Sequence, residues 1–339
     1  MKKYYSIILT TLLIVLIIIT QTGCGKVEPV TKTSYYLDTV CDITIYNMED
    51  MSEARAKEAI DKGFKVCSKY ENLLSKTKKG SDIYKINHSK GKAVKVDDET
   101  IKVVNKGIQY GDLSKGRFDI TIGKVTDLWD FHSEKPKVPA EVDIKKALSA
   151  VSYKQIKIEG DTIALENPEG EIDLGGIAKG YIADRVADSL KEQGVTNAIV
   201  NLGGNIVAIG GKNQETSFNI GIERPYSDRT EIVGSVHMKN QTIVTSGIYE
   251  RNFKVKDKIY HHILDVKTGY PVDSDVEAVT IVADIGRSVD CDGLSTTCLL
   301  LGVEKGKALI ESLDGVEALF IDKNNKITYT SGMNFVPKK

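Results

Sequence analysis

Hydrophobic side chains recur at helical spacing in several stretches of the chain. Between residues 52 and 75 they lie three or four positions apart, which predicts a long amphipathic helix. Asp98 can cap a second helix, and the apolar positions of 182–190 mark a third, which Gly194 can end. Two more helices are predicted near the C-terminus, at Leu294–Leu301 and Val303–Leu313.

Short apolar runs of strand character are interspersed with these helices. The first is a single strand over Tyr35–Tyr46, and the polar segments 76–92 and 134–141 are predicted loops. The other predicted strands are Ala198–Leu202, Ile206–Ile209, Phe218–Ile222, Val233–Met238, Gln241–Val244, Glu277–Val282, Ala318–Ile321 and Ile327–Thr330. Because strands and helices do not alternate regularly, the pattern favours an α+β fold over a doubly wound parallel sheet.

The N-terminus has the pattern of a targeting segment. Two lysines precede an apolar run over residues 7–19, which is short for a membrane span and typical of a signal peptide. Thr22-Gly23-Cys24 then resembles a bacterial lipoprotein signal, although Gln21 stands where an aliphatic residue is usual. We therefore expect cleavage after residue 23, lipidation of Cys24 and a tether over residues 24–33. A plain secretory signal and an uncleaved anchor are the alternatives.

Composition narrows the function only slightly. The 339 residues suffice for one large domain or two closely joined ones, and a net charge of −1 gives no argument for nucleic-acid binding. No CxxC pair exists, so zinc and thioredoxin-like chemistry are not expected. The cysteines after the signal are predicted to be small buried residues, with a disulfide permitted outside the cytosol: Cys41, Cys67, Cys291 and Cys298.

Two distant segments could together carry chemistry on a diphosphate. The stretch 173–180 (Asp-Leu-Gly-Gly-Ile-Ala-Lys-Gly) offers a carboxylate, glycines that let the backbone approach a ligand, and Lys179 to neutralise a phosphate. Asp292 and Thr296 lie four positions apart, which on a helix places both oxygens on one face. Such oxygen ligands suit a hard cation such as Mg²⁺. The alternatives are a strand-to-helix turn at 173–180 and a helix N-cap at Asp292.

Three other motifs are weaker. His262 lies next to His261 and three residues before Asp265, and a histidine of near-neutral pKa can take a proton from a hydroxyl nucleophile. A hydrogen-bonded core histidine is the alternative. The glycine pair in 201–205 fits a turn or bulge, and Ser246 has no base beside it in the sequence, which weakens a serine-hydrolase interpretation.

Taken in order, these motifs resemble one protein family. Residues 34–335 are similar to the ApbE-type FAD:protein FMN transferases, which are extracytoplasmic and often lipoproteins. Two departures are Leu37, where the family commonly has Met, and Val266, where it has Pro. The segments that carry the resemblance are 118–123 with 128–129, 173–181, 201–204, 245–247, 262–265 with 268–269, and 292–296.

The resemblance implies a fold and a ligand set. The expected fold is an ApbE-like, T-fold-related domain over 34–335, with mixed sheets, packed helices and a flavin site in a cleft between two lobes. Mg²⁺, or Mn²⁺ in its place, would be held by the Gly176 carbonyl, Asp292 and Thr296, with Ser295 adjacent. FAD would contact Leu37, Arg117, Phe118, Asp119, Asp173, Lys179, His262 and Ile263.

The implied reaction is transfer of FMN from FAD to a Ser or Thr hydroxyl of an acceptor protein, with release of AMP. His262, or Asp265 acting through it, would help to deprotonate the hydroxyl. An Mg²⁺-dependent FAD pyrophosphatase and a non-catalytic flavin-binding lipoprotein are the alternatives. The implied location is the extracytoplasmic face of the bacterial membrane, with Cys24 as the lipid anchor.

Overall fold

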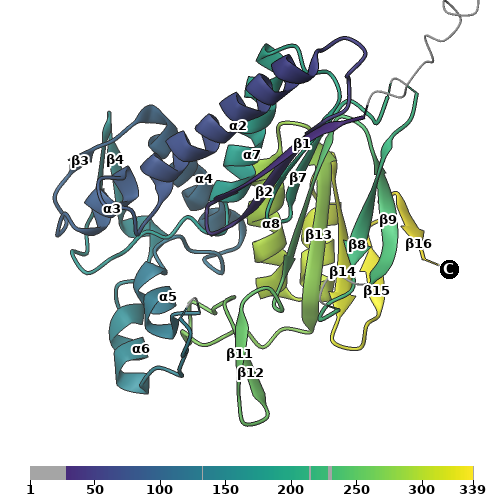
Figure 1. Ribbon diagram of the computed structural model, residues 1–339. Coiled ribbons are helices and arrows are strands. Elements are labelled where there is room, and N and C mark those ends of the chain that lie inside the picture. Colours follow the sequence, from purple (N-terminus) through teal and green to yellow (C-terminus); the bar gives the residue numbers. More distant parts are fainter. Residues whose placement is uncertain (1–27, 132, 214, 228–230, 339) are drawn as a thin grey trace, which may run out of the picture.

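An eight-stranded antiparallel sheet forms the centre of the molecule (Figure 1). The computed structural model describes residues 28–131, 133–213, 215–227 and 231–338. The strands, in spatial order, are β1 (Val30–Tyr36), β2 (Thr39–Ile45), β6 (Ala198–Leu202), β7 (Asn205–Ile209), β10 (Gln241–Gly247), β13 (Val276–Asp284), β14 (Val316–Asp322) and β15 (Ile327–Tyr329). Strand β13 is buried along nearly its whole length, as expected for a central strand covered on both faces.

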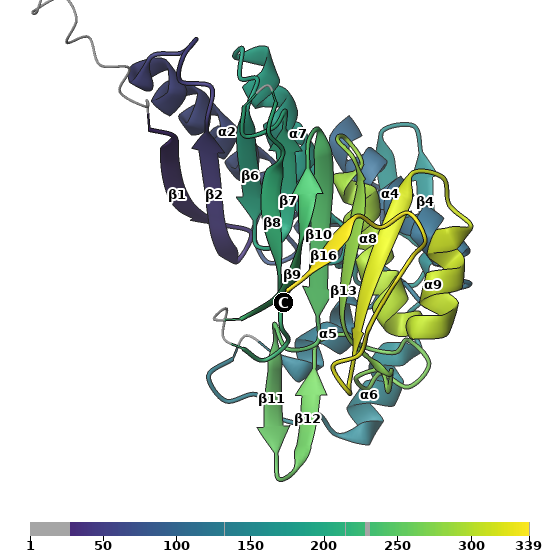
Figure 2. The same ribbon diagram turned by 90° about the vertical axis from the view of Figure 1, so that its right-hand side faces the viewer.

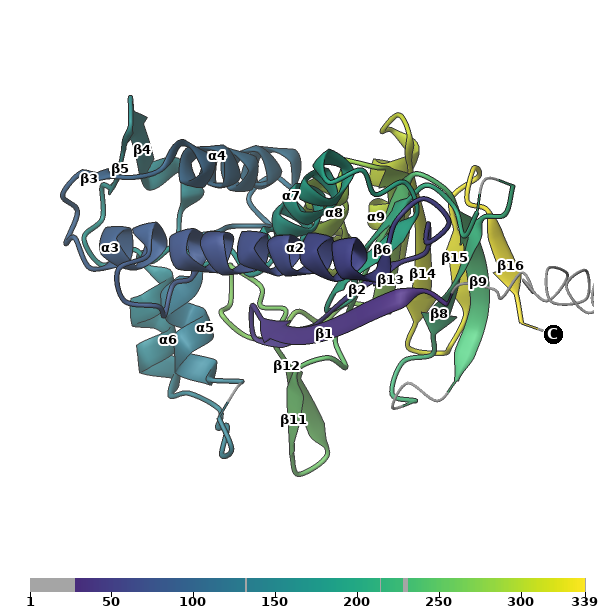
Figure 3. The same cartoon turned by 45° about the horizontal axis from the view of Figure 1, so that its top comes forward.

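Helices cover one face of this sheet. They are α2 (Glu53–Leu74), α7 (Ala178–Glu192), α8 (Ser288–Leu301) and α9 (Val303–Glu311). Helix α2 lies along β1, as Figure 3 shows, and α8 packs on β10 and β13. The long helix predicted for 52–75 is confirmed, because its apolar stripe is buried and Ser52 caps its first turn by accepting a hydrogen bond from the Arg55 N–H.

A smaller sheet covers the opposite face. It contains β8 (Phe218–Glu223), β9 (Ile232–Met238) and β16 (Phe335–Pro337), in the order β16-β9-β8 (Figure 2). A second apolar cluster, which includes Phe218, Met238 and Leu319, fills the space between the two sheets. The predicted α+β fold with packed helices is therefore confirmed, and the strand pairs within these described sheets are antiparallel.

The remaining elements extend beyond the helical layer. These are α3 (Asp82–Asn87), α4 (Asp98–Leu113), α5 (Gly123–Trp129), α6 (Glu141–Leu148), the 3₁₀ turn η1 (Tyr153–Gln155), and the short sheet of β3 (Val94–Lys95), β5 (Thr162–Leu165) and β4 (Ile156–Glu159). A hairpin of β11 (Asn252–Val255) and β12 (Lys258–His261) projects from the body of the molecule in all three views (Figures 1–3).

The start of the domain differs from the prediction. The single strand expected over Tyr35–Tyr46 is a hairpin, β1–β2, whose turn has φ of 56° at both Leu37 and Asp38. Two successive positive φ angles suit a two-residue hairpin turn. Leu and Asp at these positions do not predict such a turn from sequence as Asn-Gly would. Strand β1 begins at Val30, so the tether predicted for residues 24–33 is wrong for its last four residues.

Two smaller predictions, the cap of α4 and the loop over 76–92, differ from the structure. Asp97, not Asp98, caps α4, and the predicted loop over 76–92 contains α3. The predicted signal peptide (1–23) and Cys24 lie outside the described residues. Within the part of the chain that the structure describes, no helix combines the length and apolar character that a membrane span requires.

Candidate functional site

A cavity of about 950 Å³ lies where the C-terminal end of α2, the start of α7 and one face of α8 meet. Its walls are contributed by segments from Leu37 to Leu300. Most of the residues predicted for the site line it: Leu37, Arg117, Phe118, Asp119, Asp173, Gly176, Lys179, His262, Ile263, Asp292 and Thr296. A second hollow of about 480 Å³, between β1 and α2, contains none of them.

Asp292 is a buried carboxylate on the cavity wall. Helix α8 begins at Ser288, so Asp292 lies inside the helix and the alternative of an N-cap is excluded. Its side chain is 1% exposed, and its Oδ2 accepts a hydrogen bond of 2.9 Å from the Gly180 N–H. The Lys179 Nζ lies 3.6 Å from Oδ1. A carboxylate this deeply buried needs hydrogen-bond donors or positive charges around it. Among the described residues its partners are the Gly180 N–H and, at the longer distance of 3.6 Å, the Lys179 ammonium.

Helix α7 determines where α8 lies. At Gly180 an added Cβ would fall 2.2 Å from the Ser288 carbonyl oxygen, so only glycine permits this approach of the two helices. Asp184 accepts hydrogen bonds from the N–H groups of Ser288 and Val289 and so caps α8 from the neighbouring helix. Burial raises the pKa of Asp184 to about 6, against the opposing effect of these N–H donors. The position of Asp292 therefore follows from the sequence of α7.

The glycine turn before α7 reaches the same face of α8. A Cβ built on Gly176 would lie 3.5 Å from the Thr296 Oγ1 and 3.0 Å from the Phe118 ring. Thr296 is one turn from Asp292 on α8, as its spacing predicted. The two distant segments thus meet at one cavity.

These groups form an all-oxygen donor set of one carboxylate, one hydroxyl and the backbone of a glycine turn. Such a set fits a hard cation such as Mg²⁺. The described residues contain no cluster of three or more His, Cys, Asp or Glu side chains suited to a metal. A cation here would consequently draw its other ligands from water or from a bound phosphate, which is how Mg²⁺ is commonly held at substrate sites.

Ser295 has a different place from the one predicted. Its side chain is fully buried, and its hydroxyl donates a 2.8 Å hydrogen bond to the Asp292 carbonyl. The Ser246 hydroxyl lies 2.8 Å from the Ser295 Oγ, and donates to it because the Ser295 proton is already used. Ser295 is not on the cavity wall, whereas Ser246 is. Ser295 therefore orients Ser246.

His262 lies on the cavity wall, half-buried. Its Nδ1 lies 3.2 Å from the carbonyl oxygen of Arg251, so Nδ1 carries the proton and Nε2 is left with a free lone pair in the neutral ring. Burial, reinforced by the nearby Arg251 guanidinium, lowers the pKa of His262 to about 3. The ring is therefore neutral at pH 7 and can accept a proton.

Among the described residues no hydrogen bond joins Asp265 to His262, so the predicted action of Asp265 through this histidine has no support from the geometry. Its Oδ2 lies 3.5 Å from Arg117, and its Oδ1 accepts a 2.8 Å hydrogen bond from the Lys267 N–H. The second Arg117 amino group donates to the Leu300 carbonyl at 3.1 Å. Asp265 thus holds Arg117 between its own turn and the end of α8.

Asp119 and Phe118 shape the wall next to Gly176. The Asp119 carboxylate accepts hydrogen bonds from the Thr121 N–H, the Thr121 hydroxyl and the Tyr153 N–H. Burial raises the pKa of Asp119 in spite of these donors. Phe118 is buried against Tyr110, with ring centroids 5.9 Å apart. Asp119 accordingly holds the backbone that places Phe118 in the cavity.

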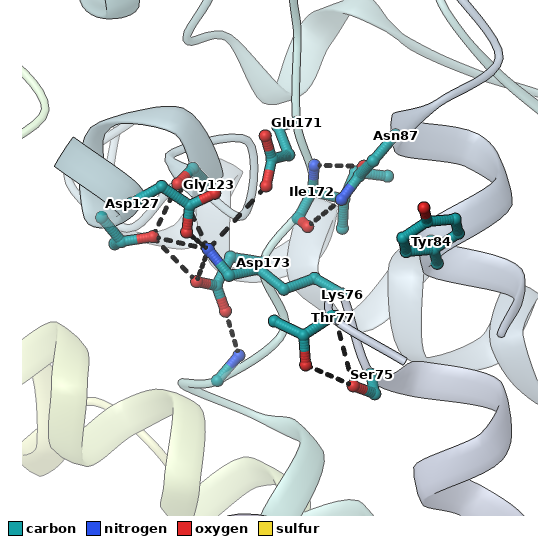
Figure 4. Close-up of polar contacts among 12 residues, drawn as sticks. Ser75, Lys76, Thr77, Tyr84, Asn87, Gly123, Asp127, Glu171, Ile172 and Asp173 are labelled. Atoms are coloured by element: carbon teal, nitrogen blue, oxygen red, sulfur yellow. Dashed lines mark hydrogen bonds and ion pairs between the residues drawn. The ribbon is translucent and has the colours of Figure 1, made fainter. Parts of the chain in front are cut away.

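Lys76 is a charged residue of this cavity that sequence reasoning missed. It follows the C-terminal end of α2, and its ammonium lies among three carboxylates, those of Asp127, Glu171 and Asp173 (Figure 4). Burial favours a neutral Lys76, but the carboxylates outweigh it and raise its pKa. Burial likewise opposes the charge on Asp173, and Lys76 keeps the pKa of that carboxyl below its usual range. In the sequence, Lys76 is one lysine in a polar segment and carries no pattern.

The glycine pair of 201–205 and the cysteines are placed as predicted. Gly203 and Gly204 have φ of 57° and 87° and form the β6–β7 turn, which confirms the turn interpretation. Gly203 also reaches the cavity wall. The four described cysteines are free and buried, as predicted for small core residues.

Comparisons with known proteins point to one family. A model of the ApbE family matches residues 37–320. The chain is 35% identical over 271 residues to an FAD:protein FMN transferase of Klebsiella pneumoniae (79% of this chain, 83% of the relative). It is 31% identical to one of Treponema pallidum (92% and 89%).

Solved structures give the same result. The crystal structure of the ApbE protein of Thermotoga maritima has a TM-score of 0.81 at 28% identity, covering 90% of this chain and 97% of that one. The flavin transferase ApbE of Vibrio cholerae has a TM-score of 0.79 at 28% identity, with the same coverage.

Proposed function

The chain belongs to the ApbE family and is an FAD:protein FMN transferase, and from this premise we propose the details of its reaction. The enzyme transfers FMN from FAD to a Ser or Thr hydroxyl of an acceptor protein and releases AMP. The transfer depends on Mg²⁺, or on Mn²⁺ in its place. The observation that carries this proposal is the convergence of Asp292, Thr296 and the Gly176 turn on one cavity.

The cavity suits a dinucleotide. Its volume of about 950 Å³ is at the upper end of the range of ligand pockets. Phe118, Leu37 and Ile263 supply apolar wall for a ring system, and Lys179 supplies a cation beside the buried Asp292. Apolar walls with a few convergent charged groups are typical of sites for large, partly charged cofactors.

Asp292, Thr296 and the Gly176 carbonyl would hold the cation at the diphosphate of FAD. A divalent cation bound there would neutralise the negative charge that develops on the departing phosphate. The chain's own contribution is to bury Asp292 and to hold it against α7 through Gly180, so that the carboxylate does not have to reorganise during the reaction.

The transfer step needs a nucleophile and a base. The acceptor hydroxyl oxygen forms a bond to the FMN phosphorus, the P–O bond to the AMP phosphate breaks, and AMP leaves with the bonding electrons. The hydroxyl proton passes to the Nε2 of His262, which is neutral at pH 7, although a pKa of about 3 makes it a weaker base than the near-neutral histidine expected from the sequence. Arg117, held by Asp265, provides a further positive charge on the wall.

The proposed location of the enzyme is the extracytoplasmic face of the bacterial membrane. Residues 1–23 would be removed as a lipoprotein signal peptide, and Cys24 would carry the lipid. Metabolic labelling with a fatty acid should mark the wild type and not Cys24→Ser. Labelling of both proteins would contradict the anchor.

Intact-mass spectrometry of an acceptor flavoprotein tests the reaction. Incubation with enzyme, FAD and Mg²⁺ should add the mass of one FMN, and Asp292→Ala should abolish the addition. Asp143→Ala removes an exposed carboxylate of α6 and should leave it unchanged. Rapid FMN release without acceptor would instead identify a pyrophosphatase. Retained FAD with no AMP would identify a flavin-binding protein.

A further inference from the structure

We propose that Lys76 is a positioning residue for the cation site, acting through Asp173 on the turn that carries Gly176. This inference rests on the proposed function, because it concerns the affinity of that same site for its cation. Lys76 is not on α7 or α8, the helices that bracket the site. It follows α2, and its side chain extends to Asp173 at the start of the turn (Figure 4).

The ammonium of Lys76 joins three segments of the chain. It bonds Asp127 and the Thr126 hydroxyl (3.0 Å) on α5, and it contacts the Gly123 carbonyl at 3.3 Å. From the segment before α7, the Asp173 Oδ2 lies 3.2 Å from Nζ and the Glu171 Oε1 lies 3.8 Å from it. The Lys76 side chain is 17% exposed, so solvent screens these charges only in part.

Asp173 transmits this arrangement to the glycine turn. Its Oδ1 accepts a 2.9 Å hydrogen bond from the Gly175 N–H, two residues on, which is the geometry of an Asx turn. The next residue is Gly176, whose backbone lies against Thr296. The direction of the Gly176 carbonyl therefore depends on where the Asp173 carboxylate is held.

Lys76 is the cation that pairs with the other oxygen of this carboxylate, at 3.2 Å. The Thr126 hydroxyl also lies 3.0 Å from the Asp173 Oδ2, but it is only 2.7 Å from the Gly123 carbonyl oxygen. A hydroxyl has one proton, and the shorter contact takes the larger share of it. Without Lys76, moreover, the carboxyl groups of Asp127, Glu171 and Asp173 would face one another with no cation between them, where burial and Asp127 already raise the pKa of Glu171 to about 7. Their repulsion would move Asp173 and loosen the turn.

The segment stays attached to the body without Lys76. Asn87 of α3 exchanges two hydrogen bonds of 2.8 Å with the main chain of Ile172, and the Asp173 N–H donates to the Ile120 carbonyl at 2.7 Å. Loss of the ammonium should consequently affect the side chain of Asp173 and the following turn more than the path of the backbone before it.

The test measures Mn²⁺ binding by the full-length, FAD-free protein, with free Mn²⁺ read by electron paramagnetic resonance. Lys76→Met keeps the length of the side chain and removes its charge. We expect its Kd for Mn²⁺ to rise about 10–100-fold, as is usual when a group that orients a metal ligand is lost. Lys76→Arg should bring the Kd to within about threefold of the wild-type value, because it restores the charge and the donors.

Lys124→Met is the matched control. Lys124 is also close to this cluster, on α5, but it pairs with Glu169 and makes no described contact to Asp173. It should leave the Mn²⁺ affinity unchanged although it removes the same charge. Thr126→Val, which removes the weaker donor to Asp173, should raise the Kd about threefold and serves if Lys76→Met does not fold.

The outcomes separate the inference from the proposed function. A purely structural role for Lys76 predicts a lower unfolding temperature with an unchanged Kd, and that result would overturn the inference while the cation site stands. Absence of Mn²⁺ binding by the wild type, with and without FAD, would overturn both. A raised Kd for Lys76→Met, restored by arginine and absent in Lys124→Met, supports the inference.

Discussion

Gly180→Ala should separate α7 from α8 and displace the buried carboxylate of the cation site. The added methyl carbon would lie 2.2 Å from the Ser288 carbonyl oxygen and 2.8 Å from the Asp292 Cβ. The optimal van der Waals separation of non-bonded heavy atoms is about 3.5 Å or more, so the helices must move apart by roughly 1 Å. That movement also stretches the 2.9 Å hydrogen bond from Gly180 to Asp292.

Two magnitudes follow from this displacement. Overpacking of a tight helix contact costs about 1–3 kcal/mol of unfolding free energy. A misplacement of about 1 Å at a reacting centre costs on the order of 10²-fold in rate. We therefore expect kcat/KM for FMN transfer to fall about 100-fold, with the loss larger than any change in the fraction of folded protein.

The assay combines urea unfolding with the initial rate of FMN transfer at saturating Mg²⁺. Gly63→Ala is the control, because its added methyl would meet side-chain ends and no backbone atom, with the Ile43 Cδ1 nearest at 2.9 Å and the Val186 Cγ1 at 3.4 Å, and alanine favours the helix. It should keep the wild-type rate. If Gly180→Ala transfers FMN within threefold of the wild-type rate, the close approach of α7 and α8 does not position Asp292, and the reasoning is refuted.

Three further predictions concern His262, the cation ligands and a buried tryptophan outside the cavity wall. Burial lowers the pKa of His262 to about 3 from its ordinary 6.5, so the unfolded chain binds this proton more readily. Unfolding free energy should therefore fall as pH drops from about 6.5 towards 3, and His262→Gln should flatten that slope in urea titrations. Calorimetric titration with Mn²⁺ should show weaker binding for Thr296→Val and unchanged binding for Ser295→Ala. In urea unfolding, Ser295→Ala should lower the unfolding free energy by about 1 kcal/mol. The Trp129 indole donates to the Gly269 carbonyl, so Trp129→Phe should cost about 1–3 kcal/mol in the same unfolding assay.

The spatial relations that sequence predicted correctly are those set by local geometry. Asp292 and Thr296 are one helical turn apart, and that relation holds in any helix. Gly176 and Gly180 were identified because glycine at such a density signals close backbone approach. The meeting of Gly176 with Asp292 across the cavity followed from the family resemblance, since sequence spacing alone does not show that residues 116 positions apart come together.

The parts that sequence missed or misplaced depend on tertiary contacts. Lys76 owes its role to two distant segments that meet its ammonium, α5 and residues 171–173, and no local sequence pattern predicts such a meeting. Asp265 is near His262 in the chain, but the turn between them directs its carboxylate to Arg117. The β1–β2 hairpin was read as one strand because Leu37 and Asp38 adopt positive φ without a glycine to signal it.

Anomalous diffraction from crystals grown with FAD and Mn²⁺ tests the central claim most directly. We expect one strong peak within coordination distance of the Asp292 carboxylate, the Thr296 hydroxyl and the Gly176 carbonyl, and next to the FAD diphosphate. A peak elsewhere, or a diphosphate bound in the cavity away from these three oxygens, would contradict it.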